Sequence, residues 1–267
     1  MSRIAVAGAA GRMGRQLMLA TLERDDLVLC GATEHPDSEA LGVDAGLLVS
    51  SEKLGFNLVA DIAAADPTAT TIIDFTSPAN TRNLLAHAAA NKVNLVIGTT
   101  GLTEEDKNLL REAANNTAIV YASNYSVGVT LSLELLAHAA KVLGDQYDIE
   151  VIEAHHRHKV DAPSGTALSM GESVATALGR SLNSCAVYAR EGITGARKDQ
   201  TIGFATVRAG DIIGEHTVMF CGQGERLEIT HKATDRMTFA RGAVRAAAWV
   251  SEQPPGLYNM TDVLRVS

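Results

Sequence analysis

The chain of 267 residues has few cysteines and few aromatic residues, and its acidic side chains outnumber its basic ones. Its three cysteines, Cys30, Cys185 and Cys221, lie far apart, so their spacing predicts neither a disulfide framework nor a cysteine metal site. A formal net charge of −8 argues against general binding to nucleic acid. We therefore expect a protein of a reducing, cytoplasmic compartment, in which any basic cluster serves a local purpose.

Long hydrophobic runs are also absent. No uninterrupted apolar run reaches the length that a membrane-spanning helix needs, so no span is expected. The first apolar run begins at Ile4, which leaves no room for a signal peptide before it, and none is expected. The hydrophobic share of 46% is ordinary for a globular protein, and the length suits one large domain or two ordinary ones.

The first half of the chain alternates short apolar runs with helical segments. The expected strands are Ile4–Ala7, Leu27–Ala32, Thr71–Phe75, Asn94–Gly98 and Ala118–Ala122. The expected helices are Arg12–Glu23, Ala79–Asn91 and Glu104–Asn115. This alternation predicts right-handed βαβ units and a parallel sheet with both faces covered. Residues 35–60 fit the pattern poorly, and we expect a loop there with a short helix and strand.

The pattern changes after residue 126. A long apolar helix, Val127–Leu143, precedes a segment that alternates with Ile149, Val151 and Glu153 on one face. After a helix that begins near Ser164, three strand-like runs follow at Thr201–Arg208, Asp211–Phe220 and Arg226–Lys232. Short turns between adjacent runs predict an antiparallel meander. A last helix, Arg236–Val250, leads to a tail.

These patterns together predict an α/β protein. Residues 1–126 with 236–267 are expected to form a Rossmann-like, dinucleotide-binding domain with a parallel sheet. Residues 127–235 are expected to form an α+β domain for substrate binding and oligomerisation, with an open mixed sheet and helices on one face. The uncovered face of such a sheet is a place where a second subunit can pack.

A glycine turn follows the first expected strand. Gly8, Gly11 and Gly14 have the spacing that lets a backbone turn tightly, approach a pyrophosphate and bring the next helix close to the strand. Glu34 ends the second expected strand, where an acid typically accepts a hydrogen bond from a ribose hydroxyl. Together they favour dinucleotide binding, whereas the alternative is a parallel-sheet domain whose glycines are structural. Arg12 beside this turn adds positive charge that suits a phosphate.

Two further turns lie at the ends of expected strands. Residues 98–101 read Gly-Thr-Thr-Gly, and residues 122–126 read Ala-Ser-Asn-Tyr-Ser. Open α/β sheets bind ligands at this edge, and both segments offer small residues, backbone amides and hydroxyls. Either one alone is equally consistent with an ordinary turn and helix cap.

The segment from His155 to Lys159 places three imidazoles, an arginine and a lysine in five consecutive positions. No cysteine or acidic residue lies at metal-ligand spacing, so acid–base catalysis or anion binding is favoured over a metal site. A helix start follows, in which Ser164 is a plausible N-cap and Gly165 and Thr166 present backbone amides. Nothing in the sequence places Ser164 in a catalytic triad.

Three segments of the chain resemble one known family. These are the Gly8–Gly14 turn, Val96–Gly101, and the stretch Glu153–Thr166, which reads Glu-Ala-His-His-Arg-His-Lys-Val-Asp-Ala-Pro-Ser-Gly-Thr. They are similar to the 4-hydroxy-tetrahydrodipicolinate reductase (dihydrodipicolinate reductase) family, which serves the diaminopimelate route to lysine. The resemblance runs from Ile4 to about Val263, and it includes the segments Ile202–Asp211 and Gly214–His216.

The resemblance implies a role for each matching position. Pyridine nucleotide, NADH or NADPH, would be held by Gly8, Gly11, Arg12, Met13 and Glu34, and its nicotinamide side would be lined by Gly98, Thr99, Thr100, Ala122, Ser123, Asn124 and Tyr125. His155 would be the proton donor with Lys159 as its catalytic partner. His156, Lys159, Gly165 and Thr166 would bind the carboxylates of a small cyclic dicarboxylate. The resemblance also implies a homotetramer built through the second domain's sheet, and no metal.

One position departs from the family's pattern. Related sequences often have arginine directly after the acid that ends the second strand, and this chain has His35 there. A neutral imidazole binds a 2′-phosphate less well than a guanidinium does, so we expect no strong preference for NADPH. Two other functions remain open. A non-catalytic, nucleotide-sensing regulator would not need the histidine–lysine cluster, and an aspartate or semialdehyde dehydrogenase would share only the first domain.

Overall fold

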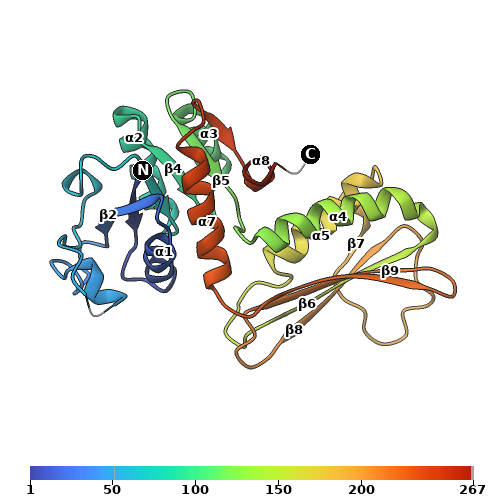
Figure 1. The fold of residues 1–267 in the computed structure, drawn as a ribbon. Coiled ribbons are helices and arrows are strands. Elements are labelled where there is room, and N and C mark those ends of the chain that lie inside the picture. The colour runs from blue at the N-terminus through green and yellow to red at the C-terminus, as the bar shows by residue number, and fades with distance from the viewer. Residues whose placement is uncertain (51, 266–267) are drawn as a thin grey trace. The chain divides into compact units, whose positions relative to one another are not determined.

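The computed structural model describes residues 1–50 and 52–265, and the chain divides into two compact units (Figure 1). The first unit comprises Met1–Val127 and Arg236–Ser267, and the second comprises Gly128–Asp235. The chain therefore leaves the first unit once and returns to it at Arg236, just before the helix Met237–Val250. The expected division of labour between the two parts, cofactor binding and substrate binding, remains a prediction.

The first unit contains a six-stranded parallel sheet in the order β11-β5-β4-β3-β1-β2. Its strands are β1 (Ser2–Ala7), β2 (Leu27–Thr33), β3 (Thr71–Asp74), β4 (Asn94–Ile97), β5 (Ala118–Tyr121) and β11 (Gly256–Tyr258). The predicted Rossmann-like sheet is thus confirmed. The strand order reverses between β1 and β3, and in open parallel sheets such a point is where ligands bind, at the carboxyl ends of the strands.

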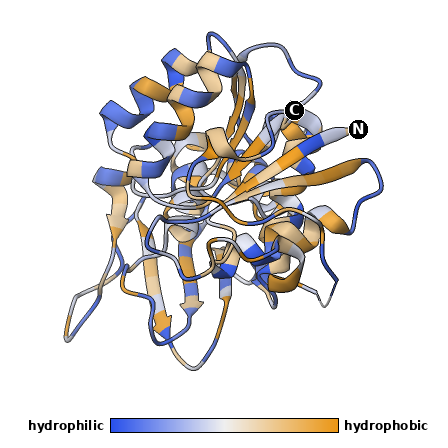
Figure 2. Ribbon diagram, turned by 90° about the vertical axis from the view of Figure 1, so that its left-hand side faces the viewer, coloured by the Kyte–Doolittle hydropathy of each residue, from blue (hydrophilic) through white to orange (hydrophobic). Residues whose placement is uncertain are grey.

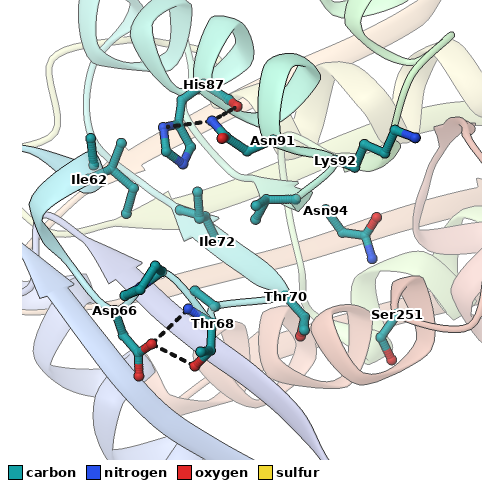
Figure 3. A pocket seen from close by; sticks show the side chains of 14 residues that line it. Ile62, Asp66, Thr68, Thr70, Ile72, His87, Asn91, Lys92, Asn94 and Ser251 are labelled. Carbon is teal, nitrogen blue, oxygen red and sulfur yellow. Dashed lines mark hydrogen bonds between the residues drawn. The ribbon is translucent and has the colours of Figure 1, made fainter.

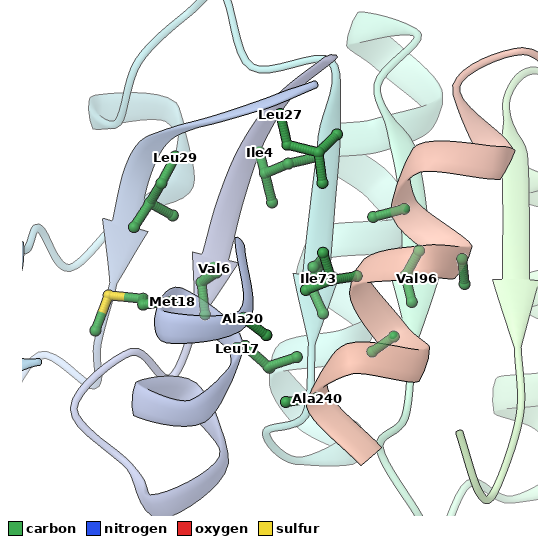
Figure 4. Close-up of a cluster of buried hydrophobic side chains, with 14 of the residues drawn as sticks. Ile4, Val6, Leu17, Met18, Ala20, Leu27, Leu29, Ile73, Val96 and Ala240 are labelled. Atoms are coloured by element: carbon green, nitrogen blue, oxygen red, sulfur yellow. The ribbon is translucent and has the colours of Figure 1, made fainter. Parts of the chain in front are cut away.

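Helices cover both faces of this sheet. The helices α1 (Arg12–Leu22) and α7 (Met237–Val250) pack on one face, while α2 (Pro78–Asn91) and α3 (Glu104–Ala113) pack on the other. Figure 4 shows Leu17 of α1 and Ala240 of α7 beside Ile73 and Val96 of the central strands. The helices alternate between hydrophilic and hydrophobic residues (Figure 2), as helices with one buried face do.

The C-terminal tail and the segment after β2 are more ordered than the sequence patterns indicate. The expected tail adds strand β11 to the edge of the sheet beside β5 and then forms the short helix α8 (Met260–Leu264). Residues 35–60 contain the short helix η1 (Ala45–Leu48) and isolated bridges, and a second short helix, η2, spans Ile62–Ala64. The carboxylate of Asp44 orders this loop, because it accepts hydrogen bonds from the amides of Gly46, Leu54 and Gly55 at 2.9 Å each.

The second unit is a five-stranded mixed sheet in the order β10-β9-β6-β8-β7, with helices on one face, as predicted. Its strands are β6 (Asp148–His155), β7 (Ala186–Val187), β8 (Ile202–Arg208), β9 (Gly214–Cys221) and β10 (Arg226–Ala233). Its helices are α4 (Val127–Leu143), η3 (Gly144–Gln146), α5 (Gly165–Ala177) and α6 (Leu182–Cys185). The alternate residues of β6, including Ile149 and Val151, are buried beneath α4 and α5.

The expected meander of the last three strands is wrong in one respect. The strands β9 and β10 do form an antiparallel hairpin, but β6 lies between β8 and β9, parallel to β8 and antiparallel to β9. Since α5 connects β6 to the later strands, β8 returns beside β6 as in a βαβ crossover. In the central position β6 pairs with a strand along each edge, while its apolar face is buried beneath α4 and α5. A short turn between β8 and β9 does not determine this order, because register and pairing follow the buried face.

The helix from Val127 to Gln146 is long and apolar enough, by length and composition, to cross a membrane. Its apolar sequence is not continuous, because Glu134 and Lys141 interrupt it, and for this reason no span was expected from apolar runs. A third of its most apolar window is buried, and Leu136 and Ala140 pack into the core of the second unit. This is the behaviour of a core helix that covers one face of a sheet.

Candidate functional site

The glycine turn after β1 has the geometry that its spacing predicts. Gly8 has φ +67°, a left-handed conformation that side chains disfavour. A Cβ at Gly14 would lie 2.0 Å from the carbonyl oxygen of Gly8, so only glycine lets α1 pack this closely against the turn. The amide of Gly11 donates to the same carbonyl at 3.1 Å, which closes the turn.

The first turn of α1 differs from those of the next two helices. Ser77 and Thr103 cap α2 and α3 by accepting amide hydrogens, whereas no side chain among the described residues caps α1 at Gly11. A helix N-terminus attracts negative charge, because its first amides have no partners within the helix. The start of α1 can therefore accept the phosphates of a nucleotide.

Glu34 lies at the end of β2 beside this turn. Its Oε2 accepts the amide of Ala10 at 2.8 Å, and its Oε1 accepts the amide of His35 at 2.9 Å. The carboxylate is therefore fixed at the edge of the turn while its remaining lone pairs can accept a ribose hydroxyl. The His35 side chain is 71% exposed, with Nδ1 3.6 Å from a carboxylate oxygen of Asp37. Arg12 is exposed at the start of α1.

The turns after β4 and β5 lie at the same carboxyl edge of the sheet. Thr99 is buried, and its hydroxyl accepts the amide of Thr76 at 3.0 Å. Tyr125 is also buried, and its hydroxyl donates at 3.0 Å to the backbone carbonyls of Ile97 and Val120. Both buried side chains thus fix the backbone near these turns through hydrogen bonds.

Other predicted residues of these two turns are more accessible. Thr100 and Ser123 are exposed, while Gly98, Ala122 and Asn124 are partly buried. A Cβ at Gly98 would lie 2.3 Å from the ring of Phe75, so this glycine makes room for the aromatic ring. Contact of these residues with a nicotinamide ring remains a prediction.

A buried polar network lies at the carboxyl end of β6 in the second unit. The Nδ1 atom of His155 is 2.6 Å from Oε2 of Glu153, two residues earlier on the same face of the strand. The guanidinium of Arg208 donates to both oxygens of Glu153 at 2.8 Å each. Glu153 also accepts the amide of Ser164 at 3.1 Å. The network joins β6, β8 and the start of α5.

A second buried contact adjoins this network. Ser164 Oγ accepts the amide of Ala167 at 3.1 Å, which confirms its role as the N-cap of α5. The same Oγ lies 2.9 Å from Nε2 of His216, and the rings of His155 and His216 meet edge-on with centroids 5.0 Å apart. Among the described residues, Nδ1 of His216 has no hydrogen-bond partner, so the pair lacks the acid that a catalytic triad requires.

Burial and charge set the protonation of this network. Burial lowers the pKa of His155, and the charge of Glu153 opposes that shift without cancelling it. Burial also lowers the pKa of His216 to about 4, and the nearby His155 adds to the shift. For Glu153, burial would raise the pKa, but hydrogen bonds from Arg208 and His155 outweigh burial and lower it. At neutral pH the network therefore holds an ionised carboxylate, an arginine cation and two largely neutral imidazoles.

The remaining predicted residues follow His155 in a loop. Lys159 Nζ donates to Asp161 at 2.7 Å and is partly buried. Within the described chain, Nδ1 of His156 is buried without a hydrogen-bond partner. Gly165 is exposed at the first position of α5, with open space where a side chain would lie, and Thr166 follows it.

The sequence reasoning missed two members of this network, Arg208 and His216, and it did not assign Glu153 a function. Both missed residues lie in segments that carry the family resemblance, but strand pairing alone brings them to β6. The signal for Glu153 was its alternation with Ile149 and Val151, which places it on the buried face, where a carboxylate requires partners. Across the described residues, no group of three histidine, cysteine or acidic side chains is placed to hold a metal ion.

A separate cavity of about 670 Å³ lies at the opposite, amino-terminal edge of the first sheet. Figure 3 shows its lining, in which Thr68 donates to Asp66 and Asn91 donates to His87. These polar groups bond to one another, and the cavity is remote from the carboxyl ends of β1 and β3. It is therefore a weaker candidate than the glycine turn and the histidine network.

Solved structures with the same fold span nearly the whole chain. The dihydrodipicolinate reductase of Paenisporosarcina sp. TG-14, solved with dipicolinate bound, is 22% identical, with a TM-score of 0.75 and coverage of 98% of both chains. GenD2 of gentamicin A biosynthesis, solved in complex with NAD, is 15% identical, with a TM-score of 0.63 and coverage of 98% of this chain and 90% of GenD2. A myo-inositol dehydrogenase from Corynebacterium glutamicum ATCC 13032 is 15% identical, with a TM-score of 0.61 and coverage of 99% and 93%. At these identities the likeness shows the fold.

Two family models carry the stronger finding. The model described as "Dihydrodipicolinate reductase, N-terminus" matches residues 2–125, and the model described as "Dihydrodipicolinate reductase, C-terminus" matches residues 128–264. The two matches cover the glycine turn and the histidine network in the order in which the chain presents them. The chain belongs to the dihydrodipicolinate reductase family.

Proposed function

We propose that this protein reduces 4-hydroxy-tetrahydrodipicolinate to tetrahydrodipicolinate with NADH or NADPH, a step of lysine and diaminopimelate biosynthesis in the cytoplasm. Overall, the substrate loses water and gains a hydride and a proton. The observation that carries the proposal is the histidine network, in which His155 is fixed by Glu153 beside Lys159 and the start of α5. Such a site supplies a proton and recognises carboxylates.

His155 is the proposed proton donor. Hydride addition to a conjugated imine leaves negative charge on the ring system, and a positioned acid lowers the barrier by neutralising that charge as it develops. The Glu153 carboxylate stabilises the imidazolium, whereas burial and Arg208 destabilise it. The balance lowers the pKa of His155, so that the imidazolium, the donating form, releases its second proton easily.

The carboxylates of the substrate are assigned to the groups that follow His155. Lys159 supplies a cation whose present partner, Asp161, is exposed and can be replaced by a ligand. His156 has an unpartnered nitrogen within the described structure, and Gly165 with Thr166 offers the start of a helix. Helix N-termini and fixed cations favour dianions, which supports a dicarboxylate substrate. The dipicolinate in the Paenisporosarcina relative is a molecule of this class.

The nucleotide is assigned to the first unit. The close packing at Gly14 and the uncapped start of α1 fit a pyrophosphate, and Glu34 is placed at the turn to accept from a ribose hydroxyl. When bound, the nucleotide supplies the hydride. The first unit would hold the phosphates and bind the adenosine end of the nucleotide at Glu34. Next to Glu34, this chain has His35 where related sequences often have arginine.

A homotetramer is proposed through the uncovered face of the second sheet. The helices α4 and α5 cover the other face, and the open face carries Ile152 and Val207, whose exposed fractions are 37% and 45%. Exposed apolar residues on a sheet are favourable contacts for another copy of the same sheet.

An assay with freshly synthesised substrate tests the proposed function. We expect oxidation of both NADH and NADPH, and we expect His155→Gln to lower kcat by about 10²–10⁴-fold while nucleotide affinity stays near wild type. A variant that keeps more than about a third of the wild-type kcat would remove His155 from the mechanism. A wild-type protein that binds the nucleotide without turnover would instead support a nucleotide sensor.

A further inference from the structure

Glu153, next to His155, is a carboxylate that accepts several hydrogen bonds. It is 1% exposed, and its Oε2 lies 2.6 Å from Nδ1 of His155. Arg208 donates to both of its oxygens, and the amide of Ser164 donates to Oε1. A buried carboxylate is costly unless every lone pair has a partner, and here three different elements supply the partners.

These partners hold Glu153 in one protonation state and one orientation. Arg208 and His155 lower the pKa of the carboxyl against the effect of burial, so the group is ionised at neutral pH. An ionised carboxylate only accepts hydrogen bonds, so Nδ1 of His155 must carry the proton that joins them. The other ring nitrogen, Nε2, is then the one that exchanges a proton with a ligand.

We propose that Glu153 is the positioning residue of this site: oriented by Arg208, it fixes the ring and the tautomer of His155 and so holds Nε2 beside Gly214, free to exchange a proton. The inference rests on the proposed function in one respect only, that His155 is the acid. A Cβ at Gly214 would lie 3.1 Å from Nε2, so glycine at this position leaves room beside the nitrogen that a side chain would fill. Glu153 acts through His155 and is not itself assigned a contact with the substrate.

The charges around His155 shift its pKa in opposite directions, and these directions can be tested. Glu153 on β6 stabilises the imidazolium, whereas Arg208 on β8 and Lys159 in the following loop destabilise it. His216 on β9 contacts the ring edge-on, and His231 on β10 in turn lowers the pKa of His216. Asp161 binds Lys159 and reduces its effect. Removing the carboxylate and removing the guanidinium should therefore shift the titration of His155 in opposite directions.

The same strand provides a matched control. Glu150 is also paired with an arginine, since Arg190 donates to both of its oxygens at 2.8–2.9 Å. It lies three residues before Glu153 and faces the other side of the sheet. Glu150→Gln thus removes a β6 carboxylate that is paired with an arginine, without altering a neighbour of His155.

The first test is an imidazole nitrogen NMR titration of the full-length protein, with the His155 signals assigned through His155→Gln. In the wild type, neutral His155 should carry its proton on Nδ1. Glu153→Gln should move its titration to lower pH, Arg208→Met should move it to higher pH, and Glu150→Gln should leave it unchanged. Shifts of the same sign in the first two variants would indicate general loosening and would overturn the proposal. A wild-type Nε2–H tautomer would overturn it without any variant.

The second test is kinetic. Glu153→Gln should lower kcat by roughly tenfold to a hundredfold, the range for losing an outer partner of a functional histidine, while KM changes little. The alkaline decline of kcat should move to lower pH in this variant and to higher pH in Arg208→Met. An unchanged pH profile in both variants would overturn the proposal. If His155→Gln proves fully active, the assignment of His155 as the acid fails, but the NMR titration still decides whether Glu153 positions His155. If the wild type shows no turnover, the proposed function fails, and the same titration remains decisive for Glu153.

Discussion

Gly214 faces the imidazole of His155 so closely that a Cβ at this position would lie 3.1 Å from Nε2. Gly214 begins β9, which pairs with β6 up to the contact of Glu215 with Ala154. The backbone at Gly214 is not in the left-handed region, so its conformation does not require glycine. The missing side chain instead leaves room for the ring of His155.

Gly214→Ala should therefore impair activity more than stability. The added methyl group either covers Nε2 of His155 or displaces the ring, and small displacements of reacting groups cost on the order of tenfold to a hundredfold in rate. We expect kcat/KM to fall by that amount while the midpoint of urea unfolding changes little. Thr217→Ala, on the opposite face of β9, is the control. Full activity of Gly214→Ala would show that Nε2 is not the working nitrogen.

Lys159→Met tests recognition of the dicarboxylate. The substitution keeps most of the side-chain length and removes the charge, which is worth about 1.5–3 kcal/mol in a hydrogen bond to a charged group. Calorimetry with pyridine-2,6-dicarboxylate should show affinity reduced by at least tenfold. Asp161→Asn should bind this ion at least as well as the wild type, because it frees Lys159 from its partner. Equal affinity of wild type and Lys159→Met would contradict the assignment.

Cofactor choice should depend on residues 34 and 35. The Glu34 carboxylate is fixed at the turn by the amides of Ala10 and His35. We expect it to accept a hydrogen bond from a ribose 2′-hydroxyl and to repel a 2′-phosphate. We expect both nucleotides to work, with NADH equal or better at pH 7.5. His35→Arg should shift the ratio of kcat/KM values toward NADPH, chiefly through KM, because the 2′-phosphate is remote from the reacting atoms. A wild-type preference for NADPH above about tenfold would give the choice to Arg12 or another cation.

Stability should fall in acid because of His216. Its pKa is lowered to about 4 in the folded protein, so between the ordinary histidine value and pH 4 the unfolded chain binds a proton that the folded chain does not. The stabilisation is complete above about pH 6.5 and is lost as pH falls toward 4, by roughly 3 kcal/mol. The lowered pKa of His155 acts with the same sign.

Urea unfolding across this pH range measures the effect. His216→Gln should make the free energy of unfolding less dependent on pH than in the wild type, even if it is lower at pH 7.5. His138→Gln, on the exposed side of α4, should leave the pH dependence unchanged. Identical slopes for wild type and His216→Gln would show that His216 titrates normally in the folded protein.

Local pattern was sufficient for strands β1 to β5 and helices α1, α2, α3 and α7 of the first unit, and for singling out the consecutive residues His155–Lys159. Apolar runs separated by helical segments specify a parallel sheet, because each strand must be buried on both faces. The capping role of Ser164 and the turn at Gly8 also follow from residue type, since hydroxyls accept first-turn amides and glycine accepts positive φ. These properties depend on residues within a few positions of each other.

Only the tertiary structure decided which distant side chains share the site. Arg208 reaches Glu153 across 55 positions, and His216 reaches Ser164 across 52, because β6 lies between β8 and β9. Adjacent runs with short turns pointed instead to a simple meander. The choice between these arrangements depends on how much apolar surface each buries beneath α4 and α5. That buried area is contributed by residues from the whole second unit, so no local sequence pattern can predict it.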